Sequence, residues 1–136
     1  MKQGNIISAY KTLRRMSALP LPLGVAYKLH KLKTSLQTQW DFQLEQEETI
    51  LKDCNGQADY TGAVHFADDP PKGVEANETN DYGKGRKEFD KRMTELSSME
   101  VDTTFTPVNL AADTPGLKLS IDDLASLEGF VNIQDE

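Results

Sequence analysis

The stretch ALPLPLG, residues 18–24, divides the N-terminal part of the chain into two amphipathic segments. Each proline removes a backbone donor and disfavours helical dihedral angles in the residue before it. Upstream, Asn5 can cap a helix whose apolar side chains recur every three or four residues. These side chains are Ile6, Ala9, Tyr10, Leu13 and Met16. The pattern predicts a first helix that begins at Asn5 and ends between Met16 and Leu19.

Residues 24–53 predict a second, continuous helix, because their apolar residues recur at close to the helical repeat. This stripe consists of Val25, Leu29, Leu32, Leu36, Trp40, Leu44 and Leu51. At 1.5 Å per residue, such a helix would extend roughly 45 Å, which is long for a chain of this size. Two helices joined by a short turn form a helical hairpin. Asn55-Gly56 is a typical helix stop. We therefore expect residues 1–55 to form a long hairpin.

The charge of this second segment changes sign along its length. Basic residues near its start are followed by acidic ones: Lys28, Lys31 and Lys33, then Asp41, Glu45, Glu47, Glu48 and Asp53. This order opposes the helix dipole, which favours acids first and bases last. Antiparallel pairing of two copies would set one copy's basic end against the other's acidic end. The pattern therefore favours a homo-oligomer.

The polar segment 56–83 predicts an excursion from the helical framework. Its one apolar island is GAVHF, residues 62–66, and unstructured loops of this length are uncommon in compact domains. We expect a small β-hairpin with ADDPPKG, residues 67–73, as its turn. Alternatively, the segment is a mobile functional loop.

The C-terminal part, residues 84–136, predicts a helix, an extended segment and a short helix. One apolar stripe on a helix over 84–99 consists of Phe89, Met93 and Leu96. This helix would pack on the β-hairpin. Alternation within 101–110 predicts one or two short strands. A capping-box pattern at Ser120 begins a short helix over 120–129, whose inward residues would be Ile121, Leu124 and Leu127. The fold class is mainly α, in a single domain of residues 1–136.

Charge is divided strongly between the two ends of the sequence. The first forty residues hold seven Lys or Arg and no acid, whereas the other ninety-six hold eight basic and twenty-two acidic residues. A surface of one sign attracts a partner of the other sign. The net charge of −7 makes a long nucleic acid an improbable ligand, because most of the chain would repel it.

Composition also bears on the compartment. The single cysteine excludes an intramolecular disulfide and favours a reducing environment. No apolar run approaches the roughly 20 residues that span a bilayer, and the N-terminal sequence lacks a signal-peptide core. We expect a cytosolic protein without a membrane segment.

The basic N-terminal stretch is the strongest candidate for a binding surface. Its cations are Lys11, Arg14, Arg15, Lys28, Lys31 and Lys33, and Tyr10 and Tyr27 are available for stacking. A nucleotide needs only a local pocket of this kind, so a compact anion is easier to accommodate than nucleic acid. The alternative is that these charges neutralise the acidic half of the chain, within one molecule or between subunits.

A second candidate for anion binding is the segment NDYGKGRKEF, residues 80–89. Gly83 and Gly85 precede a predicted helix, where backbone amides can converge on an anion beside Lys84, Arg86 and Lys87. The spacing matches neither the P-loop nor the dinucleotide fingerprint. The same residues suit a flexible joint before a solvated helix.

The sequence contains no catalytic or metal motif, and we expect neither an enzyme nor a cofactor. His65 lies near Asp59, Asp68 and Asp69, but no second histidine stands at metal-ligand spacing. His30 lies among lysines, as a surface histidine does. Cys54 ends a helix, where the dipole disfavours a thiolate, so a structural cysteine is expected.

Three stretches resemble a family of small proteins of unassigned function from tailed bacteriophages. They are AYKTLRRMSA, residues 9–18; LPLPLGVAYKLHKLKTSLQTQWDFQLEQEETIL, residues 19–51; and LKLSIDDLASLEGFV, residues 117–131. The resemblance covers residues 6–53 and 84–131 and implies two helices joined at an LP turn, a third helix and an extended segment. Residues 57–82 depart from the pattern.

The resemblance implies a role through binding, because small phage proteins without enzymatic signatures assemble in the virion, block a host enzyme or sequester a defence molecule. The leading hypothesis is a self-associating phage protein in the host cytoplasm that binds a host or phage protein and counteracts host defence. The first alternative is a protein that sequesters an anionic nucleotide signal, with phosphate contacts from Arg14, Arg15, Lys28 and Lys31. Two further alternatives are a virion or assembly factor and a nucleic-acid accessory protein.

Overall fold

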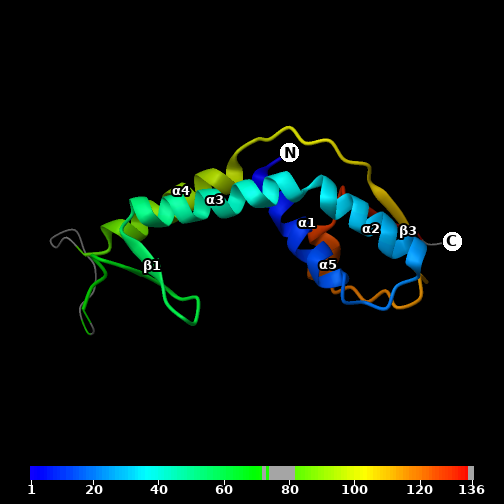
Figure 1. Ribbon diagram of the computed structural model, residues 1–136, viewed down its shortest axis with the longest axis horizontal. Coiled ribbons are helices and arrows are strands. Elements are labelled where there is room, and N and C mark those ends of the chain that lie inside the picture. Colours follow the sequence, from blue (N-terminus) through cyan, green and yellow to red (C-terminus); the bar gives the residue numbers. More distant parts are fainter. Residues whose placement is uncertain (72, 74–81, 135–136) are drawn as a thin grey trace. The chain divides into compact units, whose positions relative to one another are not determined.

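A computed structural model describes residues 1–71, 73 and 82–134 of the chain (Figure 1). The chain divides into two compact units: unit 1 contains residues 1–42 and 99–136, and unit 2 contains residues 43–98. Helices predominate in both, which confirms the mainly α class. The predicted single domain, residues 1–136, stays a prediction, because cooperative unfolding defines a domain and a division of contacts does not. Among the described residues, none of the helices combines the length and hydrophobicity that a membrane crossing demands.

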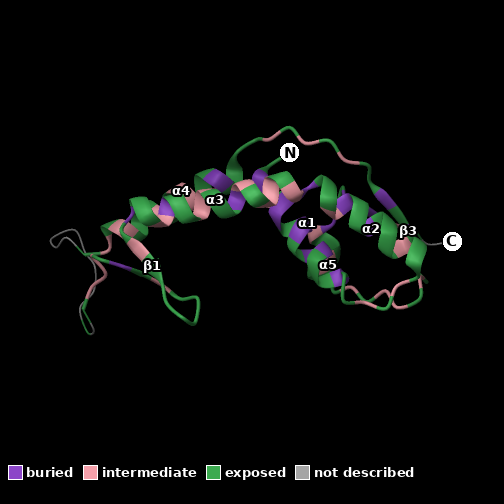
Figure 2. Cartoon of the chain, in the orientation of Figure 1, coloured by how far each residue is buried: buried purple, intermediate pink, exposed green. Residues whose placement is uncertain are grey.

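The core of unit 1 is built on two helices, α1 (Gln3–Met16) and α2 (Leu23–Ser35), which contact each other. Figure 2 shows buried residues along both of them. The stripe predicted on the first helix is buried in full. The cluster comprises Ile6, Ala9, Tyr10, Leu13, Met16, Leu29, Leu32, Leu36, Val108, Leu110, Leu127, Phe130 and Val131. The helix begins at Gln3, earlier than predicted, because the Gln3 N–H donates to the Met99 carbonyl at 2.9 Å.

The LP turn joins α1 to α2, as predicted, and a distant segment packs on it. Leu19 and Leu21 are partly buried against the core. Gly116 lies so close that a Cβ atom there would stand 2.3 Å from the Pro20 carbonyl oxygen, and its φ is +79°. Both facts require glycine at this position.

The predicted continuous helix over 24–53 is wrong, because the helix is interrupted at Leu36. α2 ends at Ser35, and α3 (Gln37–Asp53) begins one residue after Leu36. The Leu36 N–H donates to the Lys33 carbonyl, a tight 3₁₀-type closure, and the Ser35 hydroxyl donates to the Lys31 carbonyl at 3.0 Å. Leu36 itself is fully buried. The apolar spacing continues across the interruption, so periodicity alone could not reveal it.

Beyond Trp40 the predicted stripe is only partly buried, since Leu44 is exposed. α3 ends at Asp53, and Asn55 adopts a left-handed φ of 57°. The stop predicted at Asn55-Gly56 is therefore confirmed.

Unit 2 contains a two-stranded antiparallel hairpin, β1 (Gly56–Ala58) and β2 (Val64–Phe66), in which Gln57 pairs with His65. The turn is residues 59–63, so the prediction of ADDPPKG as the turn is wrong. The Asp59 carboxylate accepts from the N–H groups of Thr61 and Ala63, and Gly62 has a φ of +86°. The hydrogen bonds of the Asp59 side chain stabilise a turn at residues 59–63, and the prolines at 70 and 71 do not form the hairpin turn. Residues 72 and 74–81 of the predicted excursion lie outside the described residues.

The third predicted helix is α4 (Lys84–Ser98), and it packs on the hairpin as predicted. The rings of Phe66 and Phe89 lie 5.3 Å apart. Leu96, the last member of the predicted stripe, is buried.

A parallel pair of strands, β3 (Val108–Ala111) and β4 (Val131–Gln134), completes unit 1 together with α5 (Ile121–Ser126). Of the predicted extended segment 101–110, the structure has a strand only from Val108 onward, and β4 was not predicted. The capping box at Ser120 is confirmed. The inward placement of Ile121 and Leu124 is wrong, since both are exposed. Polar residues of α5 face α1 in their place.

The close approach of Gly116 to the LP turn can be tested with alanine. Gly129 has a similar φ of +86°, but a Cβ added there would have no atom within 4 Å, so it is a matched control. Gly129→Ala should cost about 1–2 kcal/mol from backbone conformation alone. Gly116→Ala should cost more, because the methyl group also meets the Pro20 carbonyl. Urea unfolding followed by fluorescence of Trp40 measures both, and equal losses would contradict this packing.

Candidate functional site

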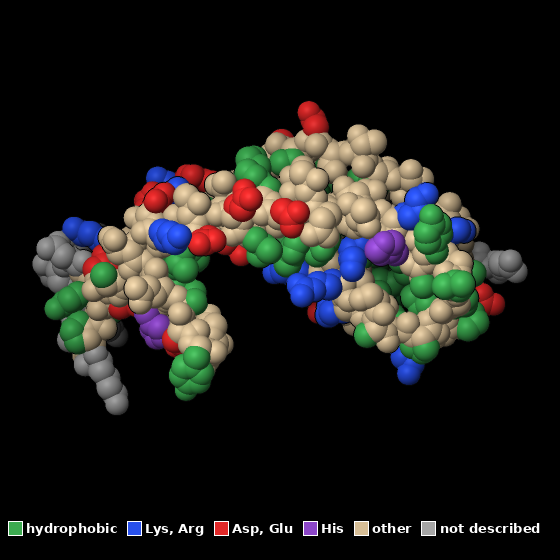
Figure 3. All heavy atoms as spheres, in the orientation of Figure 1, with side chains coloured by type: hydrophobic (Ala, Val, Ile, Leu, Met, Phe, Trp, Pro, Cys, Tyr) green, Lys and Arg blue, Asp and Glu red, His purple; other side chains and the backbone are tan. Residues whose placement is uncertain are grey.

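The structure places all six predicted N-terminal cations in unit 1, on α1 and α2. Figure 3 shows Lys and Arg side chains gathered over these two helices. Five of the six form no ion pair with any described residue: Lys11, Arg14, Lys28, Lys31 and Lys33. The alternative that the acidic half of the chain neutralises these charges, within one molecule or between subunits, stays a prediction, because the structure shows only that no described carboxylate forms a close ion pair with these five side chains.

Arg15 is the exception, because it belongs to a polar contact between α1 and α5. Its Nη2 donates to Asp123 Oδ1 at 2.8 Å and to Thr12 Oγ1 at 3.1 Å. Thr12 is buried, and its hydroxyl lies 2.6 Å from that of Ser126. The Ser120 N–H donates to Asp123 and lowers the pKa of that carboxyl group, as does the charge of Arg15. The structure gives Arg15 a role in fixing α5, in addition to any role in binding.

The predicted stacking residues differ in their exposure. Tyr10 is buried and stacked on Trp40, with ring centroids 4.6 Å apart, and its hydroxyl donates to Gln37 Oε1 at 2.7 Å. Arg14 lies over the Trp40 ring at 5.8 Å. Tyr10 is therefore not available to a ligand, which corrects the prediction. Tyr27 is exposed, and Lys31 Nζ lies 5.7 Å from its ring centroid.

α2 separates its cations onto two sides. Lys28 and Lys31 line a groove with residues 106–109. His30 and Lys33 line a smaller pocket on the other side, beside Leu13 and Met16 of α1. The six cations therefore do not form one continuous site, and sequence spacing alone did not reveal the division.

The second predicted anion site, at the start of α4, is occupied by the chain's own carboxylates. The Gly85 N–H donates to Asp68 Oδ2 at 2.9 Å. Arg86 Nη2 donates to Asp69 Oδ2 at 3.1 Å and to the Val64 carbonyl at 2.9 Å. A ligand anion would have to displace Asp68 from the helix start. Lys84 and Lys87 lie on the same helix, and both are exposed.

The acidic cluster near His65 also has an internal explanation. His65 Nε2 lies 2.8 Å from Asp59 Oδ2, and hydrogen bonds from Thr61 and His65 hold the pKa of Asp59 well below its ordinary range. Within the described ranges, no group of three potential ligands is close enough to hold a metal ion. Cys54 is buried, as expected for a structural cysteine.

No protein-family model matches the sequence, and neither the curated proteins nor the solved structures include a match. The function is therefore inferred from the residues and their geometry.

The ion pair between Asp69 and Arg86 makes a prediction about pH. The hydrogen bond from Arg86 holds the pKa of Asp69 below its ordinary value of 3.8 in the folded state. A carboxyl group whose pKa is lower in the folded state than in the unfolded state stabilises the fold at pH values above its unfolded-state pKa. This stabilisation is lost as the pH falls through the folded-state pKa. Asp69→Asn should therefore lower the free energy of unfolding by about 0.5–1 kcal/mol at pH 7 and by less near pH 2.

Urea unfolding at both pH values measures this difference. Asp90→Asn is the control, because the Asp90 side chain is on α4 and forms no ion pair among the described residues. A deficit in Asp69→Asn that stays the same at pH 2 would contradict the electrostatic role.

Proposed function

We propose that this chain is a non-enzymatic binding protein of the phage type that its sequence resembles, and that it associates with itself and with an acidic protein partner. The main observation in support of this proposal is that five N-terminal cations have no carboxylate partner in the described residues. The phage resemblance favours inhibition of a host defence component, in the host cytoplasm, as the biological role.

The first support is the exposed face of α1. Lys11 and Arg14 lie on this face, three residues apart, and both are exposed. Residues three apart on a helix are neighbours, so these like charges repel each other. An acidic surface that docks here relieves that repulsion.

The second support is the charge of unit 2. Its sequence holds thirteen acidic and seven basic residues. Among the acids of α3, Glu45 has no ion pair with a described residue, and Glu48 pairs only with Lys52 of its own helix. Unit 2 of one copy is therefore an acidic surface of the kind that the α1 face of another copy attracts. Reciprocal pairing in a two-fold dimer would use both contacts twice.

Sequestration of an anionic nucleotide is a second candidate function. The groove beside Lys28 and Lys31 favours it, because the groove combines cations with an apolar floor. The arrangement narrows the set of phosphate contacts, since Arg14 and Arg15 do not line this groove.

Charge reversal on the α1 face tests self-association. Lys11→Glu with Arg14→Glu should weaken the oligomer at least tenfold at low salt, because both changes oppose an acidic partner surface. Salt should weaken the wild-type oligomer, since the Debye length falls from about 10 Å at 0.1 M to about 3 Å at 1 M. Sedimentation equilibrium at micromolar concentration measures the mass in each case.

The control is Lys87→Glu with Lys91→Glu, which makes the same charge change on exposed positions of α4 in unit 2. This control should associate as well as the wild type or better. A monomeric wild type at low salt, or equal weakening in both variants, would contradict the proposal. In a lysate of the bacterial host, a partner bound by the α1 face should be captured by the control and lost from Lys11→Glu with Arg14→Glu.

A further inference from the structure

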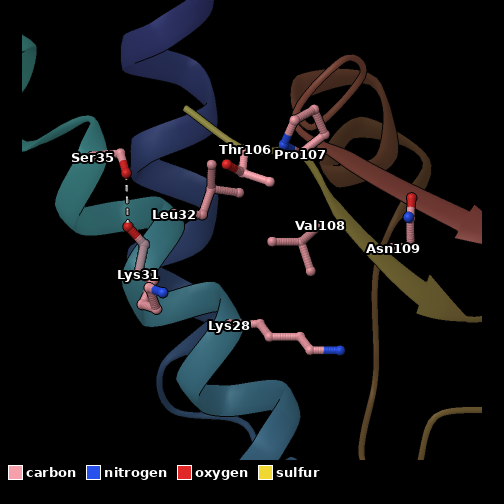
Figure 4. Close-up of a pocket in the computed structure, with 8 residues that line it drawn as sticks. All are labelled: Lys28, Lys31, Leu32, Ser35, Thr106, Pro107, Val108 and Asn109. Carbon is pink, nitrogen blue, oxygen red and sulfur yellow. Dashed lines mark hydrogen bonds between the residues drawn. The ribbon is translucent and has the colours of Figure 1, made fainter. Parts of the chain in front are cut away.

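The groove between α2 and the start of β3 lies wholly within unit 1. It has a volume of about 350 Å³, near the lower end of the range for small-molecule sites, roughly 300–1,000 Å³. Four residues of α2 and four consecutive residues of the later segment line it: Lys28, Lys31, Leu32, Ser35, Thr106, Pro107, Val108 and Asn109. Figure 4 shows Lys28 and Val108 pointing into the space between α2 and β3.

The floor of this groove is apolar. Leu32 and Val108 belong to the buried core and are 2% and 8% exposed. Pro107 adds a rigid apolar surface beside them. A ligand that rests here gains affinity by removing an uncharged part of itself from water. A small inorganic anion alone would not use this surface.

The walls carry positive charge without an opposing acid. Lys28 and Lys31 are neighbours on one helix face, and no carboxylate is among the described residues that line the groove. Lys31 is further positioned by Tyr27, whose ring centroid lies 5.7 Å from its Nζ. Two lysines that line the same groove favour a phosphate, because its negative charge is shared by several acceptor oxygens.

The strand register adds a main-chain donor at the rim. The Val108 N–H donates to the Phe130 carbonyl and the Ala112 N–H to the Gln134 carbonyl, so these amides face β4. Alternate residues of a strand point their N–H groups to opposite edges. The Asn109 N–H therefore points to the open edge of β3, where it can donate to a ligand oxygen. The Thr106 hydroxyl forms no hydrogen bond with a described residue and offers a second donor.

We propose that this groove binds a compact phosphate monoester that carries a flat ring, of mononucleotide size. Lys28 and Lys31 hold the phosphate, and the ring lies on Leu32, Pro107 and Val108. The proposal rests on sequestration, the second candidate function, and it adds the ligand class and the site. It is independent of the α1 face that carries self-association.

An NMR titration of the full-length protein tests the site with three probes: adenosine monophosphate, adenosine and inorganic phosphate. Adenosine monophosphate should shift the amide signals of residues 28–35 and 106–109, and should bind at least tenfold more tightly than either part alone. Lys28→Gln with Lys31→Gln should weaken it at least tenfold. Lys118→Gln is the control and should bind as the wild type does, because Lys118 is exposed and does not line the groove.

A second variant blocks the groove without changing its charge, so that a loss of binding cannot be explained by charge alone. Thr106 is exposed, so Thr106→Phe can fill the mouth of the groove without changing the core, and it should also abolish the shifts. Shifts that map elsewhere and survive both variants would overturn the site and leave sequestration standing. An absence of any binding at millimolar nucleotide would overturn both, and self-association measured on the same samples would be unaffected by either result. Equal affinity for inorganic phosphate and adenosine monophosphate would contradict the proposal that the ring binds to the apolar floor.

Discussion

The apolar contact between α1 and α2 is the interaction on which the rest of unit 1 depends. Leu13 and Met16 of α1 are buried in one cluster with Leu29, Leu32 and Leu36, so both helices turn their apolar faces to each other. The same cluster receives Phe130 and the first residues of β3 and β4 from the C-terminal part. Because each helix has one apolar face, its lysines and arginines must lie on the others. The cationic surfaces are a consequence of this packing.

Polar contacts hold a segment that is distant in the sequence, α5, against α1. α5 turns Asp123 and Ser126 toward α1 and leaves Ile121 and Leu124 exposed. Its contribution is therefore a part-buried hydroxyl pair and one ion pair, which depend on direction more than apolar contacts do. The same segment ends in β4, whose pairing with β3 fixes the rim of the groove. The shape of the candidate site thus depends on residues at both ends of the sequence.

Local signals in the sequence predicted the helices, the LP turn, the stop at Asn55 and the capping box at Ser120, because each depends on residues within one or two turns. The interruption at Leu36 escaped detection, since it preserves the phase of the apolar stripe. Sequence spacing also placed the cations on one surface, whereas α2 divides them between two sides. The groove joins residues 28–35 to residues 106–109. At the start of α4, Asp68 accepts from the Gly85 N–H and Asp69 pairs with the Arg86 side chain. Contacts between residues that are distant in the sequence produce no periodic pattern in it, so the sequence alone does not predict them.

Hydrogen–deuterium exchange of the backbone amides tests the central packing claim most directly. Amides that open only with the core exchange slowest, whereas frayed or surface segments exchange quickly. We predict that residues 6–16 and 29–36 are the most protected part of unit 1, and that they lose protection together with residues 127–131 as urea is added. Rapid exchange in residues 6–16 while residues 29–36 remain protected would show that α1 is not held on α2, and would contradict the central role of this packing.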